Sequence, residues 1–194
     1  MNNQSFRSFL AIDLPEKDKD KVNKLINKLR DEISGDIKWV RKFNLHITLK
    51  FIRQFRFQDI RHFKDCLEAS IRLIGNFEIR FNSLGVFPNF SKPRVIWFGL
   101  NYPEELSRIF QISENCCENL GYPRDERRFS PHLTLGRIKG KITNSQIKRI
   151  GQSISFFDPS IFSSFPVQSI NFYQSDLTSR GPVYSRLFNV KLMI

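Results

Sequence analysis

The stretch NLHITLKF, residues 44–51, alternates apolar and polar side chains as a half-buried β-strand does. Because successive side chains of a strand point to opposite faces, one face is expected to pack on a core. The side chains assigned to that apolar face are Leu45, Ile47, Leu49 and Phe51. The opposite face then carries His46, Thr48 and Lys50, so the strand presents an imidazole and a hydroxyl together.

A second copy of this arrangement occurs in SPHLTLGR, residues 130–137, where His132 and Thr134 repeat the His-x-Thr-Leu pattern. Simple alternation places Gly136 on the same face and leaves Leu133 and Leu135 for the core. The chain has only three histidines, and the third, His62, falls in a predicted helix. One His-x-Thr is unremarkable, because threonine favours strands, but two copies indicate a shared site.

Charge indicates the kind of ligand. The 194 residues include 31 Lys plus Arg against 19 Asp plus Glu, which gives a net charge of +12 and a pI near 9.9. Such a surplus attracts polyanions, so nucleic acid or another phosphorylated molecule is the expected partner. Part of the surplus also serves solubility.

Cysteine usage and hydropathy indicate a cytoplasmic protein without a membrane anchor. Cys66, Cys116 and Cys117 are odd in number and form no C-x-x-C pair, so neither a disulfide framework nor a zinc site is expected. The N-terminal apolar run is interrupted by Asp13, and no stretch approaches the roughly 20 apolar residues of a spanning helix.

Periodicity along the chain predicts strands mixed with helices. Strands are expected at 9–14, 37–40, 45–52, 77–87, 94–100, 132–138, 167–177 and 183–194, with a turn at Arg180-Gly181-Pro182. Helices are expected at 15–33, 59–74, 103–120 and 143–150, whereas residues 153–166 receive no assignment. The pattern favours an α+β fold and one domain, residues 1–194, without a linker.

Two imidazoles and two hydroxyls in one groove suit the cleavage of a phosphodiester. A base must take a proton from the attacking oxygen, an acid must protonate the leaving oxygen, and histidine performs either role near neutral pH. Hydroxyl groups can donate hydrogen bonds to the phosphate oxygens. No metal and no cofactor are expected, because the pattern offers no cluster of Asp, Glu or Cys around the histidines.

The paired motifs, about 86 residues apart, resemble those of the two-histidine (2H) phosphoesterase superfamily. Further stretches resemble one branch of it, the RNA 2′,3′-cyclic phosphodiesterases, also called the 2′-5′ RNA ligase family. They are FLAIDLP, KWVRKFNLHITLKFI, LGVFPNFSKPRVIWFGL, FSPHLTLGRI and GPVYSRL.

This resemblance implies a bilobal α+β fold with two similar lobes, each with an antiparallel sheet and helices, and a cleft between them. It also implies hydrolysis of a terminal 2′,3′-cyclic phosphate of RNA to a 2′-phosphomonoester, with 2′-5′ ligation as a minor reverse reaction. His46 would be the proton donor and His132 the proton acceptor, while Thr48 and Thr134 would bind phosphate oxygens. Arg137 would bind substrate phosphate, although simple alternation places it on the opposite face from His132.

Two alternatives stay open. One is a phosphodiesterase of the same scaffold for another cyclic nucleotide, ADP-ribose cyclic phosphate or a 2′-5′ oligonucleotide, and the other is a non-catalytic RNA-binding module. We expect a monomer whose partner is RNA with a 2′,3′-cyclic phosphate end. Candidate phosphate contacts beside the first motif are Lys38, Arg41, Lys42, Lys50 and Arg53. Trp39, Phe90 and Tyr173 are candidates for base stacking, with core packing favoured for Trp39 and Trp97.

Overall fold

A computed structural model describes residues 4–126, 128–179 and 181–193. Its elements follow the chain as β1 (Ser5–Asp13), α1 (Glu16–Glu32), β2 (Ile37–Trp39), β3 (His46–Arg56), α2 (Ile60–Ile71), β4 (Phe77–Phe87), β5 (Val95–Asn101), α3 (Glu104–Asn119), β6 (His132–Ile138), α4 (Asn144–Ser155), β7 (Phe165–Val167), β8 (Ser169–Thr178) and β9 (Gly181–Lys191). Short 3-10 turns occur at Lys42–Asn44, Phe57–Asp59 and Pro159–Ile161.

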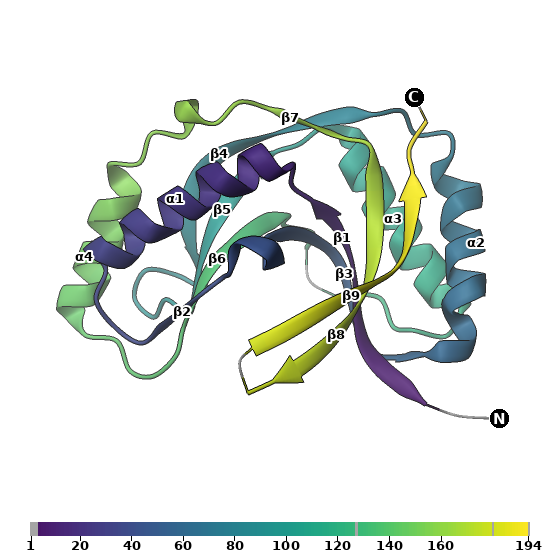
Figure 1. Cartoon of the computed structure of the whole chain (residues 1–194), viewed down its shortest axis with the longest axis horizontal. Coiled ribbons are helices and arrows are strands. Elements are labelled where there is room, and N and C mark those ends of the chain that lie inside the picture. Colours follow the sequence, from purple (N-terminus) through teal and green to yellow (C-terminus); the bar gives the residue numbers. More distant parts are fainter. Residues whose placement is uncertain (1–3, 127, 180, 194) are drawn as a thin grey trace.

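Within these residues the strands form one curled sheet in the order β7-β4-β5-β6-β3-β1-β8-β9, with β2 paired to β6. All of these strand pairs are antiparallel. Helices α2 and α3 pack together against the half that contains β3 and β9, whereas α1 and α4 cover the half that contains β4 (Figure 1). The predicted α+β class with antiparallel pairing is confirmed, and the two halves are consistent with the two expected lobes.

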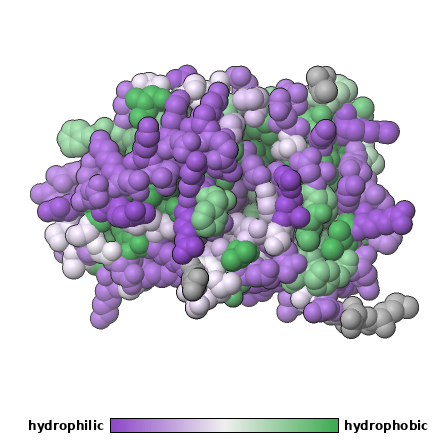
Figure 2. All heavy atoms as spheres, in the orientation of Figure 1, coloured by the Kyte–Doolittle hydropathy of each residue, from purple (hydrophilic) through white to green (hydrophobic). Residues whose placement is uncertain are grey.

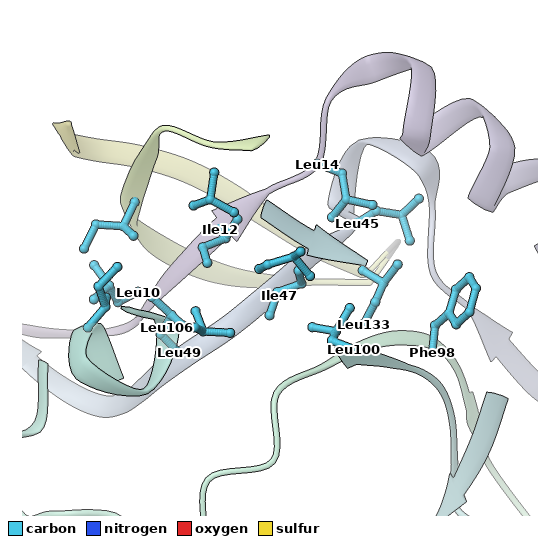
Figure 3. Packing of buried hydrophobic residues seen from close by; sticks show 14 of the residues in the cluster. Leu10, Ile12, Leu14, Leu45, Ile47, Leu49, Phe98, Leu100, Leu106 and Leu133 are labelled. Carbon is cyan, nitrogen blue, oxygen red and sulfur yellow. The ribbon is translucent and has the colours of Figure 1, made fainter. Parts of the chain in front are cut away.

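The two halves of the sheet meet where Ile47 of β3 pairs with Leu133 of β6. Both side chains are fully buried, and they join a continuous apolar core that runs from Leu10 and Ile12 in one half to Phe98 in the other (Figure 3). Burial of this kind stabilises the fold by about 25 cal/mol for each Å² of apolar surface removed from water. The core therefore fixes the two motif strands against each other.

The surface contrasts with this core. The face in Figure 2 is mostly hydrophilic, with apolar side chains scattered among the polar ones. In the described part of the chain, none of the helices has the length and apolar character needed to cross a bilayer.

The predicted elements are found with changes at their ends. The helix expected at 143–150 begins as predicted, with Thr143 and Gln146 forming a capping box, but it continues to Ser155. Residues 153–166, which received no assignment, hold the end of α4, a 3-10 turn and the start of β7. Arg180 of the expected turn and Ile194 of the last expected strand lie outside the described residues.

The prediction for the cysteines is wrong in one respect. Cys66 of α2 and Cys116 of α3 form a disulfide, with their Cα atoms 5.9 Å apart. The helices pack against each other and bring together two residues that are 50 positions apart, which spacing alone does not reveal. Cys117 is free and buried, and burial raises the pKa of its thiol to about 12.

Candidate active site

The pairing of Ile47 with Leu133 decides where the two motifs lie. Because both of these side chains enter the core, their sequence neighbours point to the other face of the sheet. One step along each antiparallel strand sets His46 beside Thr134 and Thr48 beside His132. All four side chains are partly buried there. The structure thus brings the two predicted motifs together on one face with near two-fold symmetry.

A β-bulge follows each motif. Where β1 advances from Leu10 to Ala11, β3 advances by two residues, and the same shift occurs in β6 opposite Ile96 and Trp97 of β5. An extra residue of this kind interrupts the alternation of faces. As a result two successive residues are buried in each strand, Leu49 with Lys50 and Leu135 with Gly136.

The bulges correct four of the assignments made from simple alternation. Phe51, expected in the core, is 45% exposed and faces the cleft, and Arg137 faces the same cleft as the histidines. Lys50 and Gly136, expected beside the histidines, are buried instead. Phe51 and Arg137 occupy equivalent positions in the two halves, so the cleft has an aromatic ring on one side and a cation on the other.

Lys50 is not a phosphate contact. Its Nζ donates to Glu114 Oε2 at 2.9 Å and to the carbonyl oxygen of Pro123 at 2.9 Å, and Lys50 and Glu114 are 5% and 2% exposed. The backbone N–H of Asp125 also donates to Glu114 Oε2, at 2.9 Å. This buried ion pair fastens the bulge of β3 to α3 and to the segment that leads toward His132.

The motifs open into a cleft of about 590 Å³. His46, Thr48, Thr134 and Arg137 line it. His132 is not among its described lining residues, but it is close enough for its charge to act on His46. Four further basic side chains line the cleft: Arg7, Lys38, Arg41 and Lys139. No Asp or Glu is among its described lining residues, so the cleft favours an anionic ligand.

Each catalytic candidate is oriented by the backbone two residues before it. Nδ1 of His46 lies 2.8 Å from the carbonyl oxygen of Asn44, and Nδ1 of His132 lies 2.9 Å from that of Ser130. Because a carbonyl oxygen only accepts, Nδ1 is the donor in both contacts. The neutral rings therefore carry their lone pair on Nε2, the nitrogen left for chemistry.

Aromatic side chains hold both rings in place. Phe9 stacks on His46 with centroids 4.5 Å apart, and Tyr184 meets the same ring edge-on at 5.3 Å. Phe87 meets His132 edge-on at 5.0 Å, and Trp97 lies at 6.4 Å. These contacts remove water from the imidazoles.

This burial lowers the pKa of both histidines. It brings the pKa of His46 to about 4, although the bond to Asn44 and the charge of Asp13 act in the opposite direction. Burial also lowers the pKa of His132, the bond to Ser130 opposes this, and Arg137 lowers it further. Both rings are therefore mainly neutral at pH 7 in the free protein.

The two histidines have different pairing partners in their neighbouring strands. Asp13 of β1 is the register partner of His46, whereas Gly99 of β5 is the partner of His132. Asp13 Oδ2 accepts hydrogen bonds from Tyr173 at 2.6 Å and from Asn171 at 3.2 Å. A carboxylate beside His46 favours the imidazolium there, and His132 lacks this partner across the strand.

The remaining sequence candidates divide between the cleft and other places. Lys38, Arg41 and Trp39 line the cleft, and Trp39 also packs on the core. Lys42 instead pairs with Glu16 and Asp20 of α1, and Tyr173 is held by Asp13. Arg53 and Phe90 are exposed outside the cleft, Trp97 stacks on Phe87, and His62 is exposed on α2.

Sequence reasoning missed several side chains of the site, namely Arg7, Phe9, Asp13, Phe51, Lys139 and Tyr184. None of them belongs to a repeated motif. Four of them do lie in stretches that carried the family resemblance: Phe9 and Asp13 in FLAIDLP, Phe51 in KWVRKFNLHITLKFI and Tyr184 in GPVYSRL. Among the described residues, no group of three or more His, Cys, Asp or Glu side chains has a geometry able to hold a metal ion.

The fold and the paired motifs together define a phosphoesterase. The model of the LigT-like phosphoesterase family matches residues 12–97 and 100–184, and the chain belongs to this family. An RNA 2′,3′-cyclic phosphodiesterase of Methanocaldococcus jannaschii is 37% identical over 178 residues, which cover 92% of this chain and 96% of that protein. One of Methanothermobacter thermautotrophicus is 31% identical and covers 92% and 95%.

Solved structures share the fold. A crystal structure of a Thermus thermophilus protein has a TM-score of 0.80 at 25% identity and covers 96% of this chain and 97% of its own. The crystal structure of Escherichia coli LigT complexed with 3′-AMP has a TM-score of 0.80 at 22% identity and covers 98% and 99%.

Proposed function

We propose that this protein hydrolyses the 2′,3′-cyclic phosphate end of RNA to a 2′-phosphomonoester, as one domain that acts as a monomer. The names of its relatives support this activity, because they are RNA 2′,3′-cyclic phosphodiesterases over nearly the whole chain. The observation that carries the proposal is the apposition of two imidazoles, each with Nδ1 bound to a backbone carbonyl, beside a cleft that is lined by five basic side chains and by no described carboxylate.

In the proposed reaction, Nε2 of His132 takes a proton from water while the water oxygen attacks phosphorus. The bond from phosphorus to the 3′-oxygen breaks, and Nε2 of His46 gives its proton to that oxygen. The 2′-oxygen keeps the phosphate. One proton enters His132 and one leaves His46, so exchange with solvent restores both groups after each turnover.

The remaining side chains stabilise charge. Thr48 and Thr134 donate hydrogen bonds to the non-bridging oxygens, where negative charge grows in the transition state. Arg137 reaches the cleft because of the bulge in β6 and adds a cation beside the phosphate. The chemistry assigned to these residues requires no metal ion, so activity should persist in a strong chelator.

Electrostatics favour this division of roles. Asp13 lies across from His46 and stabilises the protonated ring that an acid requires, whereas His132 has Gly99 across from it and Arg137 nearby. The negative charge of a bound phosphodiester raises the pKa of both rings and supplies protonated His46 at working pH.

The deciding experiment uses a short RNA that ends in a 2′,3′-cyclic phosphate, with the position of the product phosphate identified. We expect a 2′-phosphate product, and loss of activity by two or more orders of magnitude in His46→Ala and in His132→Ala. RNA binding should change little in both variants. Retained turnover in either variant, or a 3′-phosphate product, would contradict the proposal.

Assays with the same purified protein distinguish two alternative functions. A substrate panel of cyclic mononucleotides, ADP-ribose cyclic phosphate and 2′-5′ oligonucleotides tests whether another phosphodiester is preferred. A non-catalytic RNA-binding module would bind the RNA without turnover. Joining of ends through a 2′-5′ bond is expected only as a minor reverse reaction, because water is present in large excess over any 5′-hydroxyl.

A further inference from the structure

A second hollow continues from the catalytic cleft along the same half of the sheet. Its volume is about 480 Å³, and it shares Arg7, Ser175 and Leu177 with the cleft. Arg53 lies in it, beyond Phe51 on β3, and Arg7 places its guanidinium 5.2 Å from the centroid of the Phe51 ring. Arg7 therefore links the two spaces. We call this second space the β1–β3–β8 hollow after the strands that line it.

We propose that the β1–β3–β8 hollow binds the penultimate nucleotide of the RNA, with Arg53 at the phosphate between the last two nucleotides. This inference rests on the proposed function, which sets the terminal ribose beside His46 because that residue protonates its 3′-oxygen. His46 belongs to the half of the sheet built from β3, β1, β8 and β9. In this proposal the chain leaves the cleft from the 5′ side of that ribose, over the same half.

Charge and shape fit a nucleotide. Arg7 and Arg53 are exposed cations in the hollow. Asp176 is the acidic residue among its described lining residues, and its Oδ1 accepts a hydrogen bond from the side-chain amide of Gln174 at 3.0 Å. Phe57 and Leu177 are 40% and 65% exposed, which is ample apolar surface for a base. Cations that follow the backbone beside apolar faces for the bases are typical of single-strand binding sites.

A further hollow that adjoins the cleft suits RNA less well. A hollow of about 270 Å³ behind His46 shares Phe9, Asn44, His46 and Tyr184 with the cleft. It contains the carboxylate of Asp13, and its one described cation, Lys19, pairs with Glu16 at 3.0 Å. A phosphate would meet a negative charge there without a free cation to offset it.

Two substrates isolate the proposed contact. Adenosine 2′,3′-cyclic phosphate has no internucleotide phosphate, whereas the dinucleotide ApA with the same cyclic end adds one phosphate and one nucleoside. We expect the wild type to prefer the dinucleotide. Arg53→Ala should lower kcat/KM for the dinucleotide about fivefold, the effect of one exposed ion pair, and leave the mononucleotide unchanged.

Charge variants and salt separate this contact from a structural effect. Arg53→Lys should retain most of the preference and Arg53→Glu should abolish it. For single strands, loss of one phosphate contact reduces the slope of log affinity against log salt by about 0.7. Arg72→Ala is the matched control, because it removes the same charge at the exposed far end of α2 and should change neither substrate nor slope.

If Arg53→Ala lowers kcat/KM equally for both substrates, or for neither, the inference is overturned while the proposed function stands. If the wild type turns over neither substrate, the proposed function fails. A binding measurement then tests the proposed nucleotide site in the hollow independently of catalysis. Calorimetric titration with adenosine 2′-phosphate and with the 2′-phosphorylated dinucleotide compares the wild type with Arg53→Glu. Weaker binding of the dinucleotide alone supports the site, and an unchanged ratio of the two affinities overturns it.

Discussion

Asp13 and His46 are partners across the antiparallel pair of β1 and β3, and the charge of this carboxylate acts to raise the pKa of the imidazole. The equivalent position in the other half of the sheet is Gly99, opposite His132. The near two-fold symmetry of the two motifs is therefore broken electrostatically. The proposed acid, His46, and the proposed base, His132, need different environments, and this pairing would supply the difference.

Replacing Asp13 with Asn tests this relationship. The variant keeps the shape of the side chain but removes the charge, so the pKa of His46 should fall further. Each unit of that fall reduces the protonated fraction at pH 7 about tenfold, and kcat/KM should fall in proportion. The measurement is the pH profile of kcat/KM, in which the limb set by the pKa of His46 should move to lower pH and the value at pH 7 should fall. Tyr173→Phe is the control, because it keeps the carboxylate and should leave that limb in place.

The pH dependence of the wild type follows from the two lowered pKa values. The proposed mechanism requires one histidine protonated and one neutral, and the pKa of both free rings lies below the ordinary value of 6.5. The profile of kcat/KM, which reports the free protein, should therefore peak on the acid side of pH 6.5 and decline as pH rises through neutrality. The profile of kcat should peak at higher pH, because the bound phosphate anion raises both pKa values. A kcat/KM maximum above pH 8 would contradict the assignment.

The buried pair of Lys50 and Glu114 makes a prediction about stability. Lys50→Met leaves the Glu114 carboxylate buried without its cation, which is expected to cost about 3–5 kcal/mol. Glu114→Gln leaves the Lys50 ammonium uncompensated and should cost a similar amount. Unfolding in urea at pH 7 measures both.

In the double variant Lys50→Met/Glu114→Gln no buried charge remains, so the free energy of unfolding should recover part of the loss. Double-variant costs equal to the sum of the single ones would show that the two groups do not interact.

The sequence predicted the helices and most strands because their apolar periods are regular, and it predicted the histidine pair because the motif is repeated. It failed at Lys50, Phe51 and Gly136, where one extra residue in each motif strand reverses the facing of the side chains that follow. Bulges depend on how the neighbouring strand is paired, and alternation within one strand carries no sign of them. The bulge in β6 also explains how Arg137 reaches the cleft.

Contacts between distant segments account for the other differences. Asp13 lies near the end of a predicted strand, and its place beside His46 requires the register of β1 against β3. The disulfide between Cys66 and Cys116 requires the packing of α2 on α3. Both depend on tertiary structure that a local pattern does not encode.

Gly136 provides a test of the bulge in β6. A Cβ at this position would lie 2.9 Å from Cε3 of Trp39 and 3.0 Å from Cγ2 of Ile37, so Gly136→Ala must displace side chains that pack on the core. Such overpacking is expected to cost about 1–3 kcal/mol. Because Trp39 and Arg137 both line the cleft, KM for the cyclic phosphate should also rise.

The matched control is Gly140→Ala, two residues beyond β6, where the nearest atom to a new Cβ is Asp36 Oδ2 at 4.0 Å. It should change the free energy of unfolding by less than about 0.5 kcal/mol and leave KM unchanged. Urea unfolding and steady-state kinetics on both variants provide the comparison. If Gly136→Ala matched the control in stability and in KM, close packing of Trp39 on this glycine would not be what holds the bulge and directs Arg137 into the cleft.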